Sequence, residues 1–563
     1  MATSRLVQPN EGDTRAPLRA PERFWLLLLV ASLVTGVIAA LLMTVMHAAQ
    51  HASYAYSHGL FQQAVRRAGY GRRVAVLALA GLVTAVVVRI LQQDVPGHGG
   101  DLTETIWFRS GRMSFTKTLM QSLLSVIIVG MGASLGREGA PKQMGAATAS
   151  VASRLGGLSA AEARLLGACC GGAAMGAVYN VPLGGALFAL EVLVGTLALP
   201  LLLPALASSF VATWASWVLL PDRPTYMVAT HAAPSGTILW SLAFGPLAGL
   251  AAAAFVRLII AAHALKPKRG AFMGAPLVVF ALLGLAAGPY PELLGNGKDV
   301  AQYAFDGRLA LPLLAALVLL KPLATAACLG AGAPGGLFTP SLTFGALLGA
   351  LGGQIWRLVS PDTSVGVCAL IGAVTVLSVT MQAPLSAFIL FFELTHHVLG
   401  LAVPMMASVT GAMLVARRLE PCSIYSGKIA AGRSQARIEP GWVPGELGPW
   451  FTDQVSVVSA AADYTEILAR LLATPAAAGY LYVVDETGRL RGRIGRDQAV
   501  HPGPLPRVLA TAAAADLVHP VIGLDERTTA QDMRERLARE PGAEWPVVDS
   551  AHGRLHGVVR ARP

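Results

Sequence analysis

The chain has few charged residues. Asp, Glu, Lys and Arg make up 13% of its 563 residues, whereas soluble globular domains carry roughly 25%. Hydrophobic residues make up 54%, and the mean hydropathy is +0.57. This composition does not fit a soluble protein and predicts a polytopic membrane protein in a lipid bilayer.

Acidic residues are scarcer than basic ones, with 32 Asp and Glu against 43 Lys and Arg and a formal net charge of +11. A basic excess in a membrane protein follows from loops and tails that face an anionic inner leaflet. We therefore expect no nucleic-acid partner. We expect both termini to be cytoplasmic.

Cysteine is also scarce, at five residues, and none has a metal-ligand spacing. Adjacent Cys169 and Cys170 are expected to be small packing residues. We expect no metal and no cofactor. A cleavable signal peptide is not expected either, because residues 1–23 are polar and Arg-rich and the apolar run that follows is too long for one.

Long uninterrupted apolar runs are fewer than the hydropathy suggests. Several segments are shorter than the roughly 20 residues that a membrane span needs. Glycine-rich breaks separate them, among them "PGHGG", "GREGAP" and "GAGAPGGLFTP". Tilted and broken helices of this kind are typical of transporters and channels, in which half-helix N-termini face an anion.

The apolar region contains an internal repeat. "NVPLGGALFALEV" matches "QAPLSAFILFFEL", and "GREGAPKQMGA" from Gly136 parallels "GLFTPSLTFGA" from Gly336. The pattern predicts two repeated halves, at about 70–220 and 236–417, with the substrate site at their interface. We expect the halves to be inverted, which is the commoner arrangement in transporters.

The C-terminal part has a different composition and a repeat of its own. "VVDETGRLRGRI" and "VVDSAHGRLHGVV" begin 64 residues apart, and each unit has the pattern strand, helix, strand, turn, strand. We therefore predict an all-α transmembrane domain at 24–430 after a cytoplasmic tail (1–23). A linker (431–452) and a small cytoplasmic α/β domain (453–563) follow.

Glu138 lies in one of the most apolar parts of the chain, and a carboxylate there is a functional hypothesis by default. The residues alone leave two interpretations open, a functional acid or a structural partner of Arg137. Lys142 could form a helical pair with Glu138 or attract an anion. For Glu191 and Glu393 we expect a structural role, as partners for backbone donors or for each other's repeat.

Together these motifs resemble the CLC family of chloride channels and chloride/proton antiporters. "GREGAPKQMG", "GGLFTPSL", the two Pro-Leu helices, "CSIYSGKIA" and "PGHGGDLTETI" each correspond to a family element. The C-terminal repeat resembles a CBS-domain pair. The resemblance implies an anion transporter rather than an enzyme, and a homodimer located in the inner (plasma) membrane. For the tail we expect a structural role rather than an adenine-nucleotide site.

The resemblance also implies site residues. Glu138 would be a carboxylate gate that occupies the anion path. Chloride or another small anion would be bound by the residues that correspond to the family's pore: Gly97, His98, Gly99, Arg137, Gly139, Leu337, Phe338 and Tyr425.

The sequence departs from the family pattern at two positions that matter for function. Val192 stands where exchangers commonly carry an inner, proton-transferring glutamate, which favours a passive chloride channel. His98 stands where the selectivity loop usually has serine, so pH regulation and a different anion selectivity are open. The alternative is a chloride/proton antiporter, or a fluoride-permeable exchanger, of the same fold.

Overall fold

The computed structural model describes most of the chain. The described residues are 21–93, 102, 106, 113–228, 236–266, 274–396, 399–427, 451–452, 455–460, 462, 466–467, 470, 480–485, 488–495, 544–548 and 554–560. The chain divides into two compact units, residues 18–432 and a second unit that includes residues 433–563.

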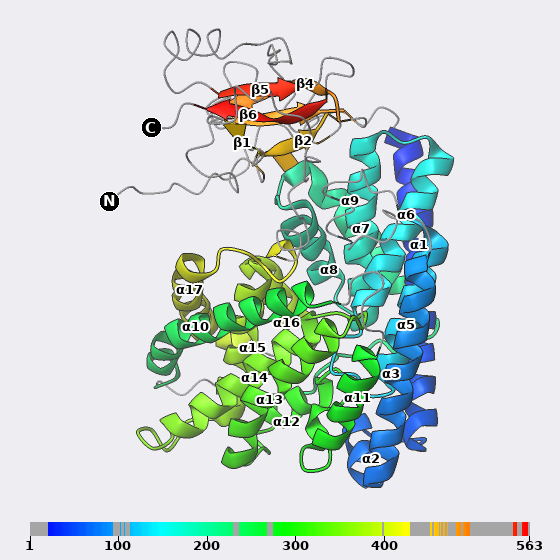
Figure 1. The fold of residues 1–563 in the computed structure, drawn as a ribbon. Coiled ribbons are helices and arrows are strands. Elements are labelled where there is room, and N and C mark those ends of the chain that lie inside the picture. Colours follow the sequence, from blue (N-terminus) through cyan, green and yellow to red (C-terminus); the bar gives the residue numbers. More distant parts are fainter. Residues whose placement is uncertain are drawn as a thin grey trace. The chain divides into compact units, whose positions relative to one another are not determined.

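The first unit is all helical, with helices of unequal length and tilt (Figure 1). Its first half contains α1 (Pro21–Tyr54), α2 (Phe61–Arg67), α3 (Tyr70–Gln93), α5 (Phe115–Gly130), α6 (Gly139–Gly156), α7 (Ala160–Tyr179), α8 (Pro182–Phe188), a π-helical turn η1 (Ala189–Val194) and α9 (Leu199–Ser216). Its second half contains α10 (Gly236–Ala264), α11 (Ala275–Ala286), η2 (Pro291–Leu293), α12 (Lys298–Phe305), α13 (Leu311–Gly330), α14 (Phe338–Trp356), α15 (Val365–Met381), α16 (Pro384–Thr395), η3 (Leu399–Leu401) and α17 (Ala402–Leu419).

Within the described residues, five helices are long and apolar enough to cross a membrane: Glu22–Tyr54, Tyr70–Leu91, Leu199–Ser216, Gly236–Ala264 and Leu311–Gly330. Shorter apolar helices, including α5 and α15, accompany these long helices. The predicted mixture of long spans and short, interrupted helices is confirmed.

The two halves share local structure down to individual hydrogen bonds. After α5, the amides of residues 131, 132 and 133 donate to the carbonyls of residues 127, 129 and 128. After α13, the amides of residues 331, 332 and 333 donate to the carbonyls of residues 327, 329 and 328. Gly132 and Gly332 have φ of +113° and +91°, a region that favours glycine. The sequence repeat is therefore also a structural repeat.

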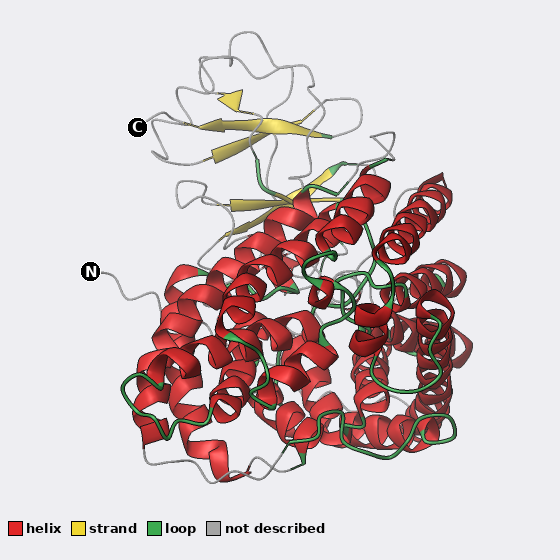
Figure 2. Ribbon diagram, turned by 90° about the horizontal axis from the view of Figure 1, so that it is seen from below, coloured by secondary structure: helices red, strands yellow, loops and turns green. Residues whose placement is uncertain are grey.

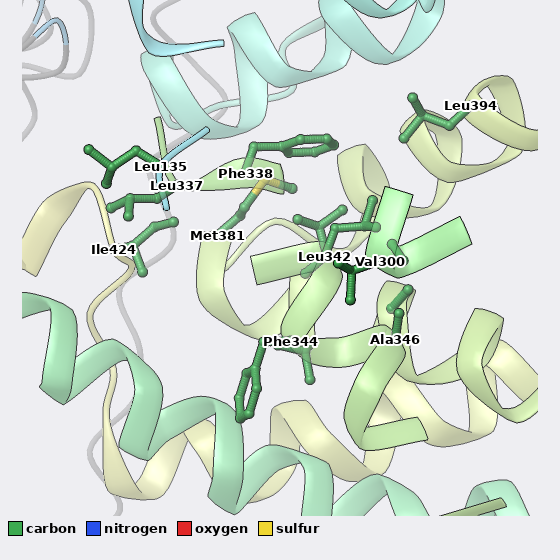
Figure 3. Packing of buried hydrophobic residues seen from close by; sticks show 14 of the residues in the cluster. Leu135, Val300, Leu337, Phe338, Leu342, Phe344, Ala346, Met381, Leu394 and Ile424 are labelled. Atoms are coloured by element: carbon green, nitrogen blue, oxygen red, sulfur yellow. The ribbon is translucent and has the colours of Figure 1, made fainter. Parts of the chain in front are cut away.

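Small residues let the helices of this unit pack closely. A Cβ atom on Gly345 of α14 would lie 2.5 Å from the carbonyl oxygen of Gly372 on α15, so only glycine permits this approach. Figure 3 shows buried hydrophobic residues around the start of α14, with Leu337, Phe338 and Leu342 near Met381 of α15. The core of the second half therefore surrounds the N-terminal end of α14.

The second unit contains the β-strands of the described chain (Figure 2). They form two three-stranded sheets, ordered β1-β6-β5 and β2-β3-β4. The strands are β1 (Phe451–Thr452), β2 (Val457–Ser459), β3 (Tyr480–Val484), β4 (Leu490–Gly495), β5 (Glu544–Val548) and β6 (Leu555–Arg560). The β3–β4 and β5–β6 hairpins each have an irregularity in register, at Val483/Val484 and Val547/Val548. These positions are 64 residues apart, as the sequence repeat predicts. An all-α membrane unit with a small strand-containing unit confirms the predicted fold class.

Candidate anion site

Glu138 is fully buried at the contact between the two halves of the helical unit. Its Oε1 atom accepts a hydrogen bond of 2.7 Å from the backbone N–H of Phe338. Its Oε2 atom accepts one of 3.0 Å from the Tyr179 hydroxyl and one of 3.2 Å from Thr339 Oγ1. Both carboxylate oxygens are therefore satisfied without a cation, which is the way proteins hold a buried anion with neutral donors.

Two helix N-termini meet at this carboxylate. Glu138 is the N-cap residue of α6, and the bonded N–H of Phe338 belongs to the first residue of α14. The first amides of a helix have no partner within the helix, and the macrodipole places partial positive charge there. The end of α14 is therefore an anion-binding position, and the Glu138 carboxylate occupies it.

A pair of glycines brings the two helix ends together. Gly136 and Gly336 form an antiparallel bridge, with N–H···O bonds of 2.7 and 2.8 Å in the two directions. A Cβ atom on Gly336 would collide with the Glu138 carboxylate and lie 2.9 Å from the amide nitrogen of Gly139. Glycine at 336 is therefore needed for Glu138 to reach the end of α14. Gly136 and Gly336, which correspond in the predicted repeat, are therefore also in direct contact.

Tyr179 and Thr339 were not predicted as site residues from the sequence. Their oxygen atoms lie 2.5 Å apart, and both side chains are buried. Tyr179 ends α7, and Thr339 follows Phe338 inside the quoted "GGLFTP". The motif pointed to the segment of Thr339, but no periodicity or spacing placed the Tyr179 hydroxyl beside Glu138.

Arg137 is buried but does not pair with Glu138. Its guanidinium lies over the ring of Tyr179, with Cζ 4.7 Å from the ring centroid, and its Nε has no hydrogen-bond partner in the described structure. The pairing of Arg137 with Glu138, on which the structural interpretation depended, therefore does not form. The Arg137 guanidinium contacts the ring of Tyr179, and it is the Tyr179 hydroxyl that donates to the Glu138 carboxylate.

Lys142 and Tyr425 form a second polar contact one helical turn along α6. Lys142 Nζ lies 3.4 Å from the Tyr425 hydroxyl. It also lies 4.9 Å from the ring centroids of both Phe188 and Tyr425. The helical pair with Glu138 does not form, because the carboxylate turns toward α14. The other alternative, that Lys142 attracts an anion, stays a prediction.

Glu191 and Glu393 accept hydrogen bonds from each other's half. Glu191 accepts from the amides of Leu385 and Ser386, at 3.3 and 2.6 Å, in the first turn of α16. Glu393 accepts from the amides of Leu183 and Gly184, at 3.0 and 2.6 Å, in the first turn of α8. The structural role predicted for both carboxylates is confirmed. Such reciprocal contacts require an approximate twofold relation between the halves.

The remaining predicted residues lie near these contacts or outside the described chain. Gly139 begins α6, and Leu337 is the buried N-cap of α14. Val192 is buried in the π-helical turn η1, beside the residue that caps α16. Gly97, His98 and Gly99 lie outside the described residues. Groups of three or more metal-binding side chains do not occur among the residues that were described.

Comparison with known protein families gives a match over most of the helical unit. The family described as voltage gated chloride channel matches residues 76–417. A putative chloride channel protein ClcB-like from Ralstonia nicotianae is 31% identical over 388 residues, covering 66% of this chain and 89% of the relative. The voltage-gated ClC-type chloride channel ClcB of Escherichia coli O9:H4 is 33% identical over 370 residues, covering 63% and 86%.

Solved structures share the fold at lower identity. A slow cyanobacterial Cl⁻/H⁺ antiporter superimposes with a TM-score of 0.63 at 19% identity, covering 73% of this chain and 99% of that one. A CLC-type fluoride/proton antiporter gives a TM-score of 0.55 at 20% identity, covering 71% and 97%. At these identities the likeness shows the fold.

Proposed function

Because the chain belongs to the voltage gated chloride channel (CLC) family, a family of anion transporters and channels rather than enzymes, we propose that it is a passive chloride channel gated by Glu138. Anion transport across a membrane is the function of the family. The passive mechanism, the gate and the choice of chloride are parts of the proposal.

The observation that carries the proposal is the Glu138 carboxylate at the N-terminus of α14. A permeating anion must exchange its hydration shell for donors that release it again, and backbone amides at a helix end fulfil this need. The carboxylate occupies the place of such an anion. When it moves away, the N–H of Phe338 and the hydroxyls of Tyr179 and Thr339 become available to chloride.

Val192 supports a channel rather than an exchanger. Proton-coupled exchange needs a titratable group or a water path that brings protons to the gate from the inside. Val192 is apolar, and the neighbouring Glu191 is bonded to the backbone of α16. In the described part of this region, then, no carboxylate is left for proton transfer beside Val192.

Liposomes that contain the purified protein test the mechanism. A chloride gradient is imposed, and chloride and internal pH are followed together. We expect chloride to move down its own electrochemical gradient without coupled proton movement. Uphill proton transport driven by chloride would contradict the channel and establish the antiporter. Replacing chloride by fluoride in the same assay measures selectivity.

The gate is tested by Glu138→Gln, which keeps the size of the side chain and removes its charge. We expect the variant to conduct with most of the pH dependence lost. His98→Ser is the matched variant for the other candidate sensor. If the pH dependence survives in Glu138→Gln and vanishes in His98→Ser, the histidine rather than the glutamate is the sensor.

The proposal extends to the assembly and its location. We propose a homodimer with one pore in each subunit, located in the inner membrane with both termini cytoplasmic, and a CBS-type pair formed by the second unit. The two matching hairpins, β3–β4 and β5–β6, support the tandem arrangement. Crosslinking in native membranes and protease accessibility of the tail from either side test these points.

A further inference from the structure

Three basic residues from separate segments lie close to one another beside the proposed gate. Arg137 directly precedes Glu138, Arg223 lies in the segment after α9, and Lys298 is the first residue of α12. The pKa of Lys298 is lowered to about 8, mainly by burial and in addition by the positive charges of Arg137 and Arg223. The three charges are therefore within electrostatic reach of one another.

Hydrogen bonds fix the segment that carries Arg223. The hydroxyl of Thr225 donates to the backbone carbonyl of Tyr179 at 3.0 Å, and the Tyr179 side chain is the one that donates to the gate carboxylate. Two residues further along, the backbone of Met227 forms two hydrogen bonds with the side chain of Gln302 in α12, at 3.0 and 2.7 Å. The segment is thus tied both to the gate donor and to α12.

The beginning of α12 is held beside the beginning of α14. Gly297, the N-cap residue of α12, has φ of +93°, and a Cβ atom on it would collide with Thr343 of α14. The Thr343 hydroxyl donates to the carbonyl of Thr339 at 2.8 Å, four residues earlier. Thr339 in turn contacts Glu138. The end of α12 that carries Lys298 therefore lies about one turn of α14 from the gate.

The acidic residues next to these cations in the sequence are bonded to other groups. Asp299 raises the pKa of Lys298 and so offsets part of its charge, but one of its oxygens accepts from the backbone N–H of Gln62 at 2.9 Å. Asp222 accepts from the side-chain amide of Asn180 at 2.8 Å and lines a cavity that none of the three basic residues lines. Among the residues that the structure describes, the three basic side chains form no ion pair.

We propose that Arg137, Arg223 and Lys298 form an anion-capture site outside the gate, which attracts chloride to the mouth of the anion path. The inference rests on the proposed anion transport but not on whether transport is passive or proton-coupled. Arg137 is 8% exposed and its Nε has no hydrogen-bond partner in the described structure, so it offers a donor at the buried end of the site. Lys298 is half-buried and Arg223 is exposed. These two cations raise the local chloride concentration and the rate of encounter without holding the anion tightly.

The test is the initial chloride flux in liposomes at a fixed low chloride concentration, over a series of ionic strengths set with sodium gluconate. The assay is run at about pH 7, where Lys298 is charged. We expect Lys298→Gln and Arg223→Gln each to lower the flux about two- to fivefold at low ionic strength. The difference should vanish as the Debye length falls from about 30 Å at 0.01 M to about 3 Å at 1 M. The flux at saturating chloride should not change.

Arg308→Gln is the matched control, because Arg308 is 72% exposed and already pairs with Asp306 at 3.4 Å. It should leave the flux unchanged at every ionic strength. An equal loss of flux at all ionic strengths in Lys298→Gln would show a structural role and overturn the inference. Wild-type flux and salt dependence in both Lys298→Gln and Arg223→Gln would overturn it as well. A wild-type protein that does not transport chloride would instead refute the proposed function.

Lys298→Cys separates charge from shape within one variant. A cationic methanethiosulfonate reagent, added to the detergent-solubilised protein before reconstitution, restores the positive charge, whereas an anionic one reverses it. We expect the cationic reagent to return the flux at low ionic strength to within about twofold of wild type and the anionic reagent to lower it further. Treated wild-type protein controls for Cys422, the native cysteine that is not buried. Equal effects of the two reagents would overturn the inference.

Discussion

Replacing Tyr179 by phenylalanine is the most direct perturbation of the proposed Glu138 gate in its closed state. The change removes the hydroxyl that donates to Glu138 Oε2 at 3.0 Å and keeps the ring that packs 5.3 Å from the ring of Phe338. A hydrogen bond to a charged group contributes about 1.5–3 kcal/mol. Since about 1.4 kcal/mol corresponds to a factor of ten, the closed state should lose about 10- to 150-fold in its equilibrium with the open state.

The lower end of this range applies to Tyr179→Phe. Thr339 Oγ1 and the N–H of Phe338 still donate to the carboxylate after the change. We therefore expect chloride flux at neutral pH to rise about tenfold, with the flux of Glu138→Gln as the upper limit. Stopped-flow measurement of chloride release from liposomes, normalised to the amount of reconstituted protein, determines the rate.

Two controls separate the gate from a general effect. Tyr54→Phe removes another buried hydroxyl, which donates to the carbonyl of Met131 at 2.9 Å and has no contact with Glu138. It should leave the gate equilibrium unchanged. Tyr179→Phe combined with Glu138→Gln should conduct like Glu138→Gln alone, because the two side chains act on one equilibrium. An unchanged flux in Tyr179→Phe, or an equal rise in the double variant, would refute the reasoning.

Three further variants test the scaffold around the site. Glu393→Ala leaves two amides at the start of α8 without their acceptor. We expect the free energy of unfolding to fall by about 2 kcal/mol, which is measured as a lower melting temperature in detergent. Lys321→Met removes a buried ammonium that donates to three backbone carbonyls before α12. We expect the free energy of unfolding to fall by about 3 kcal/mol. An unchanged melting temperature would contradict this expectation. Gly336→Ala places a methyl group where the Glu138 carboxylate lies, so we expect raised flux with no further increase when Glu138→Gln is added.

The sequence predicted the features that depend on pattern. Hydropathy and the offset between the two Pro-Leu motifs were sufficient for a helical membrane unit made of two matching halves. Glu138 stood out because a carboxylate among apolar residues needs a reason. The hydrogen-bond donors to Glu138 could not all be predicted, because the position of the Tyr179 hydroxyl depends on how α7 packs in the folded unit. In the same way, the contact of Lys142 with Tyr425 depends on where the segment after α17 lies in the folded unit.

The donor and the acceptor of the bond at the proposed gate occupy equivalent positions in the two halves. Glu138 follows Gly136 by two residues, and Phe338 follows Gly336 by two residues. The Gly136–Gly336 bridge is symmetric, whereas the 2.7 Å bond runs in one direction, from the Phe338 amide to the Glu138 carboxylate. A duplicated fold supplies two helix N-termini that suit an anion. The two equivalent positions differ, with glutamate at 138 and phenylalanine at 338, and the Glu138 carboxylate lies at the helix N-terminus of the other half. A carboxylate in place of Phe338 would add a second negative charge beside the first, and the repulsion would exclude both from one site. Phe338→Glu should therefore abolish the closed state, and chloride flux that remains low and pH-dependent in that variant would show that the site does not hold a single anion.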